Sequence, residues 1–217
     1  MIGRTALVIF DGRGDVNPVL ALWAKRFPNV ARVSQLGIDQ TAPIHQQRNA
    51  VWQQWLTTST TDWLLMVDDD MIPTALTEPL LSSHRLMAGA RYWGRIGKES
   101  HAPDGEVGCG CLRVNRLAAD LLGPDPFTPN PGECECSAFC RRCREAGIWP
   151  AKLGRIGHCI GVYVMPGETA DDDYRIMFPD APKPKKPPGD TDVPASLGDN
   201  PKCPILVTAA GSVLLPT

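Results

Sequence analysis

The sequence predicts an α/β protein with a mixed sheet flanked by helices. In the first 67 residues, short apolar runs alternate with segments of helical periodicity in the order strand, helix, strand, helix, strand. That order is the pattern of a parallel sheet with covering helices. The last of these strands, residues 63–67, is continuously apolar, as expected of a strand buried on both faces. A hydrophobic content of 43% and a charged content of 21% are ordinary for a globular domain.

Turn and cap residues mark the elements of the first half. The first strand ends at Phe10, just before the turn signal Asp11-Gly12. Asn17 and Pro18 then supply a helix N-cap and a first-turn proline. The expected elements are a strand over residues 7–10, a helix from Pro18 to near Pro28, a strand over residues 30–33, a helix over residues 41–59 and the strand over residues 63–67.

The second half is less regular, but the same signals locate its elements. Small residues around Gly108 and Gly110 indicate a strand that other backbone or a ligand approaches closely. Gly147 indicates the end of a helix. The expected elements are a short helix over residues 73–81, strands over residues 86–93 and 107–114, a helix capped by Asn115 that runs through Leu122, a helix over residues 135–146 and a strand over residues 156–164.

The composition changes after the last expected strand, where prolines cluster. We therefore expect a folded domain over residues 1–165 and a Pro-rich C-terminal tail or lid over residues 166–217. Lys183, Lys185 and Lys186 lie among prolines that keep the chain extended. Their charges are expected to face solvent, as in a linker, or an anionic ligand.

Three consecutive carboxylates follow the apolar strand over residues 63–67: Asp68, Asp69 and Asp70. Acids crowded at the end of a buried strand repel one another unless a cation neutralises them. The carboxyl ends of the strands are also where ligands bind in open α/β sheets. A divalent metal site is the preferred interpretation, and a solvated acidic turn is the alternative.

Charge and hydropathy restrict the location and the partners. A net charge of −2 gives no global attraction for nucleic acid or anionic membranes. The apolar runs are too short for a transmembrane helix, and the first lacks the features of a signal peptide, so we expect a cytoplasmic protein. Its eight cysteines are then expected to be reduced. Cys134, Cys136, Cys140 and Cys143 raise a zinc hypothesis, although free thiols are the default because the ligands would share one helix.

The order of motifs resembles the GT-A glycosyltransferases, including bacterial and phage members, over about residues 4 to 165. The likeness is carried by Arg48-Asn49, Asp68-Asp69-Asp70, Gly108-Cys109-Gly110, Glu135-Cys136 before Phe139, Glu145-Ala146-Gly147 and His158. This resemblance implies a GT-A, Rossmann-like fold and a nucleotide-sugar donor, with a UDP-sugar favoured. It also implies a Mn²⁺ or Mg²⁺ cofactor and an acceptor hydroxyl. For a phage protein, the expected cytoplasm is that of the host. The acceptor stays open, and a modified DNA base is one candidate because members of this family also occur in phages.

The resemblance assigns roles to individual residues. Asp68, Asp70 and His158 are expected to bind the metal, because carboxylate oxygens suit hard cations and manganese also accepts imidazole. The expected donor-binding residues are Phe10, Arg48, Asp68 and Asp69. Arg48 offers planar donors for a diphosphate or a base.

Glu135 is the expected general base, since a helix start favours its ionised form. If it acts opposite the leaving diphosphate, direct displacement inverts the anomeric centre. Glu133 is a competing candidate. The sequence also departs from the family, because Cys136 stands where the pattern usually has Asp. Two other functions therefore remain: a nucleotidyltransferase, and a nucleotide-sugar-binding protein without catalytic activity.

Overall fold

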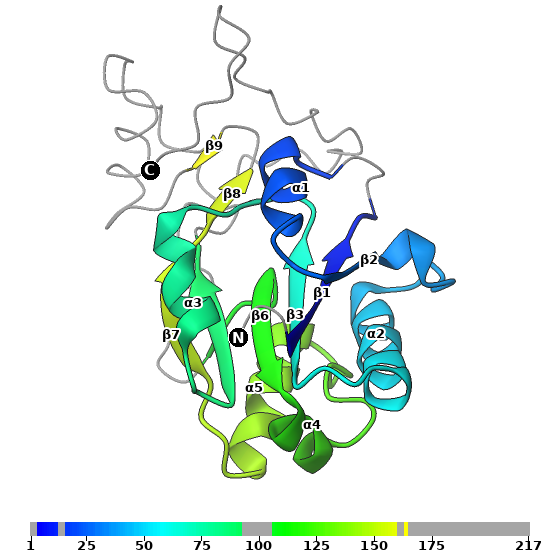
Figure 1. The fold of residues 1–217 in the computed structure, drawn as a ribbon. Coiled ribbons are helices and arrows are strands. Elements are labelled where there is room, and N and C mark those ends of the chain that lie inside the picture. The colour runs from blue at the N-terminus through cyan, green and yellow to red at the C-terminus, as the bar shows by residue number, and fades with distance from the viewer. Residues whose placement is uncertain (1–3, 13–15, 93–105, 160–162, 165–217) are drawn as a thin grey trace, which may run out of the picture.

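The computed structural model describes residues 4–12, 16–92, 106–159 and 163–164. Six strands form the main sheet in the order β2-β1-β3-β6-β5-β7 (Figure 1). Their bounds are β1 (Thr5–Phe10), β2 (Asn29–Arg32), β3 (Trp63–Asp68), β5 (Met87–Arg91), β6 (Cys111–Asn115) and β7 (Ala151–Arg155). The helices are α1 (Pro18–Ala24), α2 (Ile44–Thr58), α3 (Glu78–Ser82), α4 (Arg116–Leu122) and α5 (Glu135–Glu145). No helix in these ranges is both long enough and apolar enough to cross a bilayer.

The first half of the sheet is parallel, as predicted from the alternation of strands and helices. β1 pairs in parallel with both β2 and β3, and Phe10 stands opposite Asp68 in the register. β6 runs antiparallel to β3 and to β5, so the sheet as a whole is mixed. The carboxyl ends of β1 and β3 and the start of β6 therefore lie together, at the same end of these three inner strands.

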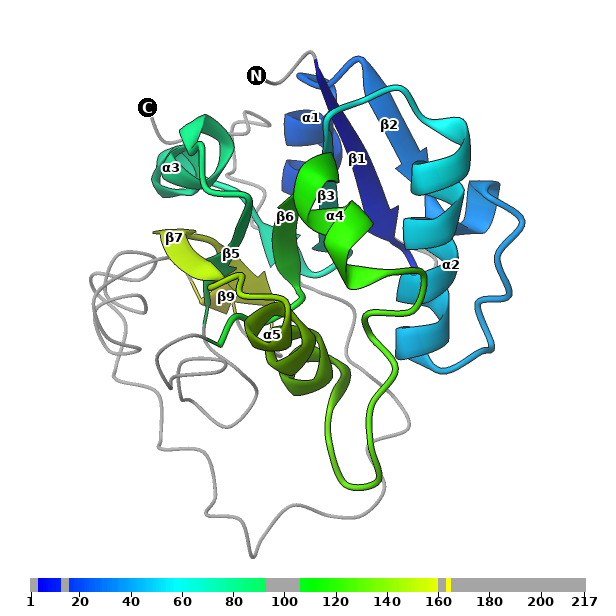
Figure 2. The ribbon, with the colours of Figure 1, turned by 90° about the horizontal axis from the view of Figure 1, so that it is seen from below.

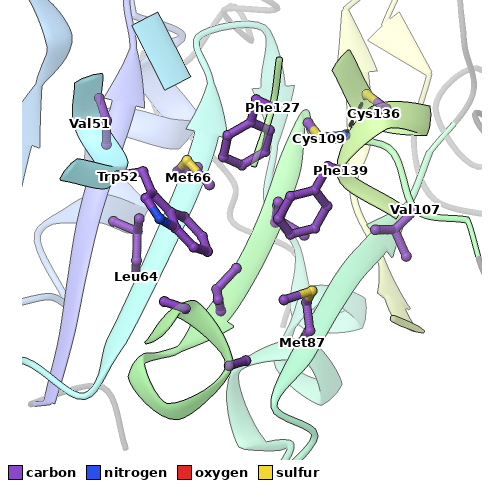
Figure 3. Packing of buried hydrophobic residues seen from close by; sticks show 14 of the residues in the cluster. Val51, Trp52, Leu64, Met66, Met87, Val107, Cys109, Phe127, Cys136 and Phe139 are labelled. Carbon is purple, nitrogen blue, oxygen red and sulfur yellow. Dashed lines mark hydrogen bonds between the residues drawn. The ribbon is translucent and has the colours of Figure 1, made fainter. Parts of the chain in front are cut away.

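Helices cover both faces of the sheet (Figure 2). One face packs against α1 and α3, through Leu20, Trp23 and Leu80. The other packs against α2, α4 and α5, and its centre is the aromatic group of Trp52, Phe127 and Phe139 (Figure 3). Phe127 and Phe139 stack with ring centroids 4.7 Å apart, while Trp52 meets both edge-on. β3 supplies apolar side chains to both layers, which explains its continuously apolar sequence.

A second, three-stranded sheet adjoins the acidic end of β3. It has the order β4-β8-β9, with bounds β4 (Met71–Ile72), β8 (Gly157–Cys159) and β9 (Tyr163–Val164). β4 follows Asp70 directly and pairs antiparallel with β8, so that Met71 stands opposite His158. This small sheet brings the late part of the chain back to the acidic triplet.

Several element predictions are confirmed. Asn17 caps α1 and Asn115 caps α4, each accepting a hydrogen bond from the backbone two residues on. Gly147, with φ of 73°, follows α5. The helix expected near residues 73–81 is a 3₁₀ turn (Ala75–Thr77) that leads into α3.

Other element predictions are wrong. The strand expected over residues 107–114 begins at Cys111, because residues 109–110 form a turn. The strand expected over residues 156–164 is divided into β8 and β9, while β4 and β7 were not predicted. The tail over residues 166–217, with its three lysines, lies outside the described residues.

Candidate active site

The predicted site residues gather at the carboxyl end of β1 and β3. Phe10 and Asp68 are the last residues of these paired strands. Arg48 lies in the second turn of α2, which packs on the same sheet. The fold therefore brings three parts of the first half of the chain to one point, as the parallel arrangement requires.

The buried Arg48 forms an ion pair with the half-buried Asp68. Arg48 is 2% exposed, and its Nη2 donates to the two carboxylate oxygens of Asp68 over 2.9 and 3.2 Å. The guanidinium also lies 4.6 Å from the centroid of the Phe10 ring, a cation–π contact. Its Nε and Nη1 have no hydrogen-bond partner among the described residues, although both are buried. Buried N–H groups are nearly always paired in native proteins, so we expect a water or a ligand oxygen to accept from these two donors.

Asp70 and His158 meet although 88 residues separate them in the chain. The Nε2 atom of His158 lies 3.1 Å from Oδ2 of Asp70, and both side chains are about nine-tenths buried. The pairing of β4 with β8 holds the two residues together, and the backbone N–H of Cys159 donates to the carbonyl of Asp70 over 2.9 Å. A carboxylate and an imidazole are thus placed side by side next to the Arg48–Asp68 pair.

Asp69 is 4% exposed, and its backbone ties the site to neighbouring segments. Its N–H donates to the carbonyl of Phe10 over 3.2 Å, and its carbonyl accepts from the N–H of Asn17 over 3.1 Å. These bonds fix the turn that carries the acidic triplet. The structure therefore gives Asp69 a part in building the site, and its contact with a donor stays a prediction.

The carboxylates at the carboxyl end of β3 repel one another, and Arg48 offsets this repulsion in part. Burial raises the pKa of Asp68, Arg48 lowers it, and the nearby Asp70 and Glu135 raise it again. Burial opposes the charge of Arg48, but Asp68 and the other acidic groups around it hold its pKa above the ordinary value. The acidic groups outnumber the cation, so a further cation would relieve their repulsion.

Glu135 is the first residue of α5, half-buried, and close enough to act electrostatically on both Arg48 and Asp68. Its Oε1 accepts a long hydrogen bond of 3.5 Å from the thiol of Cys136. Glu133, the competing candidate, is held by Arg141, whose Nε and Nη2 each donate over 3.1 Å. It also accepts from the backbone N–H of Asn130. Glu133 therefore serves the loop before α5, and the carboxylate near the acidic end of β3 is Glu135.

Cys136 is 7% exposed and belongs to the apolar core. Its Sγ accepts the backbone N–H of Cys109 over 3.2 Å. This hydrogen bond joins the start of α5 to the Gly108-Cys109-Gly110 segment. In this position the side chain packs and accepts a hydrogen bond, and the carboxylate beside it belongs to Glu135.

The four cysteines of the zinc hypothesis do not converge. The Sγ of Cys140 contacts the backbone of Val107, and the Sγ of Cys143 lies 3.0 Å from Sδ of Met87. Both thiols are buried in the core, whereas Cys134 is exposed at the helix start. A single tetrahedral site from these four residues is therefore excluded by their placement.

Two features of the site were not assigned from the sequence. The carboxylate of Asp11, 3% exposed after β1, accepts from the backbone N–H and the hydroxyl of Ser34. The signal that could have revealed it is the one used for Asp68, an acid directly after a buried strand. The Tyr92 ring packs edge-on against His158 at 5.4 Å, and its hydroxyl accepts from the N–H of Gly110 over 3.1 Å. A side chain at Gly110 would collide with Met71 and crowd Tyr92, so the glycine allows this approach.

Comparisons with known proteins give the fold. No protein-family model matches the sequence, and no curated protein matches it. Among solved structures, A197 from STIV matches with a TM-score of 0.54 and 16% identity, over 71% of this chain and 85% of that one. The chain has a GT-A-like α/β fold. An identity this low shows the fold alone.

Two further structures match with TM-scores too low to carry an argument. One is a mutant of Drosophila β1,4-galactosyltransferase 7 in complex with manganese, UDP-Gal and xylobiose, with a TM-score of 0.44 and 19% identity, over 69% of this chain and 64% of that one. The other is glucosyl-3-phosphoglycerate synthase from Mycobacterium tuberculosis in complex with Mn²⁺, UDP and glucosyl-3-phosphoglycerate, with a TM-score of 0.37 and 16% identity, over 71% of each chain.

Proposed function

We propose that the protein is a metal-dependent glycosyltransferase that moves a sugar from a nucleotide-sugar donor, favoured to be a UDP-sugar, to an acceptor hydroxyl with inversion. The observation that carries the proposal is the meeting of Asp70 and His158 at 3.1 Å beside the Arg48–Asp68 pair. These four side chains come from distant parts of the sequence. They lie at the carboxyl end of the strands, where open α/β sheets bind nucleotides.

Arg48 supplies the donor-binding charge in this proposal. Its unpartnered Nε and Nη1 are buried, so an acceptor that reaches them gains charge-assisted hydrogen bonds without competition from bulk water. Diphosphate oxygens and the carbonyls of a pyrimidine base are acceptors of this kind. The Phe10 ring, at the end of β1, packs against the Arg48 guanidinium, and this contact keeps the N–H donors of Arg48 in a fixed orientation.

The donor types at this end of the strands suit a divalent metal. Asp70 and His158 already lie 3.1 Å apart and offer a carboxylate oxygen and an imidazole nitrogen, whereas the Asp68 carboxylate, which accepts from Arg48 in this structure, would have to turn toward them to complete the set. Such a donor set suits Mn²⁺ and, less well, Mg²⁺. Burial, Asp70 and Glu135 raise the pKa of Asp68 although Arg48 lowers it, and a further cation would offset the repulsion between these carboxylates. When bound, the metal would supply positive charge against the departing nucleotide diphosphate.

Glu135 is the proposed general base. Its position at the start of α5 lies within electrostatic range of Arg48 and Asp68 but outside their ion pair. A carboxylate there accepts the proton of the acceptor hydroxyl as that oxygen attacks the anomeric carbon. Displacement from the side opposite the leaving group inverts the configuration. Glu133 is unsuited to this role because Arg141 holds it.

Product analysis tests the proposal against its rivals. The full chain is incubated with nucleotide sugars and Mn²⁺, with and without pooled acceptors, and the nucleotide products are separated by chromatography. Release of UDP supports a transferase, including one that slowly hydrolyses its donor. Release of pyrophosphate from a nucleoside triphosphate would indicate the nucleotidyltransferase, and donor binding without any product would indicate the binding protein.

A further inference from the structure

Three potential metal ligands meet at the start of α5: the thiols of Cys134 and Cys136 and the carboxylate of Glu135. Their ligand atoms all lie within 4.8 Å of one another. Ligands around a tetrahedral zinc ion lie roughly 3.3–3.8 Å apart, given metal–ligand distances of about 2.0–2.3 Å. Small side-chain rotations would therefore bring the three atoms onto one ion. Cys134 is exposed, Glu135 is half-buried and Cys136 is 7% exposed.

Both sulfur atoms already accept backbone hydrogen bonds of the kind that support a metal-bound thiolate. The N–H of Cys109 donates to Sγ of Cys136 over 3.2 Å, and the N–H of Ser137 donates to Sγ of Cys134 over 3.4 Å. Figure 3 shows Cys109 and Cys136 next to each other at the edge of the core. Hydrogen bonds from neighbouring groups to a metal ligand orient that ligand and tune the metal. The Ser137 donor also belongs to the N-terminus of an 11-residue helix, which favours negative charge.

We propose that Cys134, Glu135 and Cys136 form a binding site for a thiophilic divalent cation of the Zn²⁺ class, separate from the oxygen-rich site at Asp68 and Asp70. Two sulfurs and one oxygen select such an ion over Mn²⁺ or Mg²⁺, which prefer oxygen. Three protein ligands leave a fourth position for water. The site differs from the four-cysteine zinc hypothesis, since it excludes Cys140 and Cys143.

Occupation of this site would regulate the reaction, because it takes the carboxylate of Glu135. A carboxylate bound to zinc is a poor proton acceptor, so the ion would inhibit transfer. This consequence rests on the proposed function of Glu135, whereas binding of the ion does not. The two are therefore tested by different readouts.

Binding is tested with Cd²⁺, whose bonds to thiolates absorb in the near ultraviolet. The full chain is freed of metal with a chelator, kept reduced with a phosphine and titrated with Cd²⁺. We expect the wild type to show this absorption and Cys134→Ser and Cys136→Ser to lose it. The apparent affinity of each variant for Cd²⁺ should fall by at least about tenfold, which is the smaller loss seen when only a hydrogen-bond partner of a metal ligand is changed. Zn²⁺ should displace Cd²⁺, and Mn²⁺ should not.

Cys140→Ser is the matched control, since it removes a thiol one helical turn further along α5, and it should bind Cd²⁺ as the wild type does. Cys134→Ser is the decisive variant because its side chain is exposed and its loss leaves the core intact. Wild-type Cd²⁺ absorption in Cys134→Ser, or an equal loss in Cys140→Ser, would overturn the proposal.

Inhibition is a separate measurement. Micromolar Zn²⁺ in excess of chelator should inhibit transfer by the wild type, and the inhibition constant should rise at least about tenfold in Cys134→Ser, in line with the affinity loss. An inactive protein that still binds Cd²⁺ through Cys134 would contradict the proposed function and leave the metal site intact. Equal zinc inhibition in the wild type and Cys134→Ser would overturn the regulatory role.

Discussion

Two arginines at opposite ends of the sheet use their charges in different ways. Arg116, at the end where β3 begins, donates hydrogen bonds to the carbonyls of Trp55, Leu56, Ser59 and Thr61 and covers the ring of Trp55. Arg48, at the end where β3 finishes, is more deeply buried, but among the described residues only one of its nitrogens has a partner, Asp68. Arg116 completes the end of α2, whose last carbonyls need partners. The Nε and Nη1 donors of Arg48 have no acceptor among the described residues.

The same contrast separates two glutamates beside α5. Glu133 has Arg141 and the backbone of Asn130 as partners, while Glu135 accepts a long hydrogen bond from a thiol. A charge whose partners are all supplied by the fold stabilises the fold. A buried charge with unused hydrogen-bonding capacity costs stability, and such a cost is typical of ligand sites.

The largest effect is expected from Glu135→Gln. The amide keeps the shape of the side chain but accepts no proton, so transfer should fall by about 100- to 10,000-fold while donor binding persists. Initial rates and UDP titrations on the same protein check this prediction. Glu133→Gln is the control and should retain most activity. Reversed effects would show that the two glutamates have been assigned the wrong way round.

Arg48→Lys should weaken UDP binding. Lysine keeps the positive charge against Asp68 but loses the planar donors, so one charge-assisted hydrogen bond, about 1.5–3 kcal/mol or roughly 10- to 150-fold in Kd, is lost. Calorimetric titration of UDP in the presence of Mn²⁺ measures the change. If Kd stays at the wild-type value, the unpartnered donors of Arg48 do not contact the nucleotide.

Arg116→Lys applies the same substitution at the other end of the sheet and should affect stability instead. Lysine cannot reach four carbonyls at once, and we expect a loss of about 1–2 kcal/mol in unfolding free energy, or roughly 2–4 °C in Tm per kcal/mol. Thermal denaturation gives the value, and the Kd for UDP should not change. If Arg116→Lys loses as much UDP affinity as Arg48→Lys, the assignment of a structural role to Arg116 and a nucleotide-binding role to Arg48 is wrong.

The smallest effect concerns the pH dependence of Glu133. Hydrogen bonds from Arg141 and from the backbone of Asn130 lower its pKa from the ordinary 4.5. An acid with a lowered pKa stabilises the fold above its ordinary pKa, and that contribution disappears as pH falls through the folded value. Glu133→Gln should therefore lower Tm slightly at pH 7, and the difference should vanish in acid. A difference that grows as pH falls would contradict this sign.

The sequence predicted the elements that local signals specify. Continuous apolar character predicted β3, and the asparagines at positions 17 and 115 predicted the starts of α1 and α4. β7 was missed because its residues are all half-buried and lack an apolar pattern. β4 was missed because two residues carry no periodicity.

The residue types of the candidate site were also predictable, but their geometry was not. An acidic triplet after a buried strand and an arginine in a helix are visible in the sequence. The contact between Asp70 and His158 depends on the register of β4 with β8, a pairing between segments far apart in the chain. The inward position of the Cys136 thiol likewise depends on the tertiary packing of α5.

Calorimetry of UDP binding tests the central claim, that the acidic end of β3 holds a metal and a nucleotide. UDP is titrated into the wild type and into Asp70→Asn, each with Mn²⁺ and again with a chelator. Asp62→Asn, which changes an acid just before the opposite end of the same strand, is the control. We predict Mn²⁺-dependent binding in the wild type and in Asp62→Asn and its loss in Asp70→Asn. Equal Mn²⁺-dependent affinity in all three proteins, or no UDP binding by the wild type, would contradict the account.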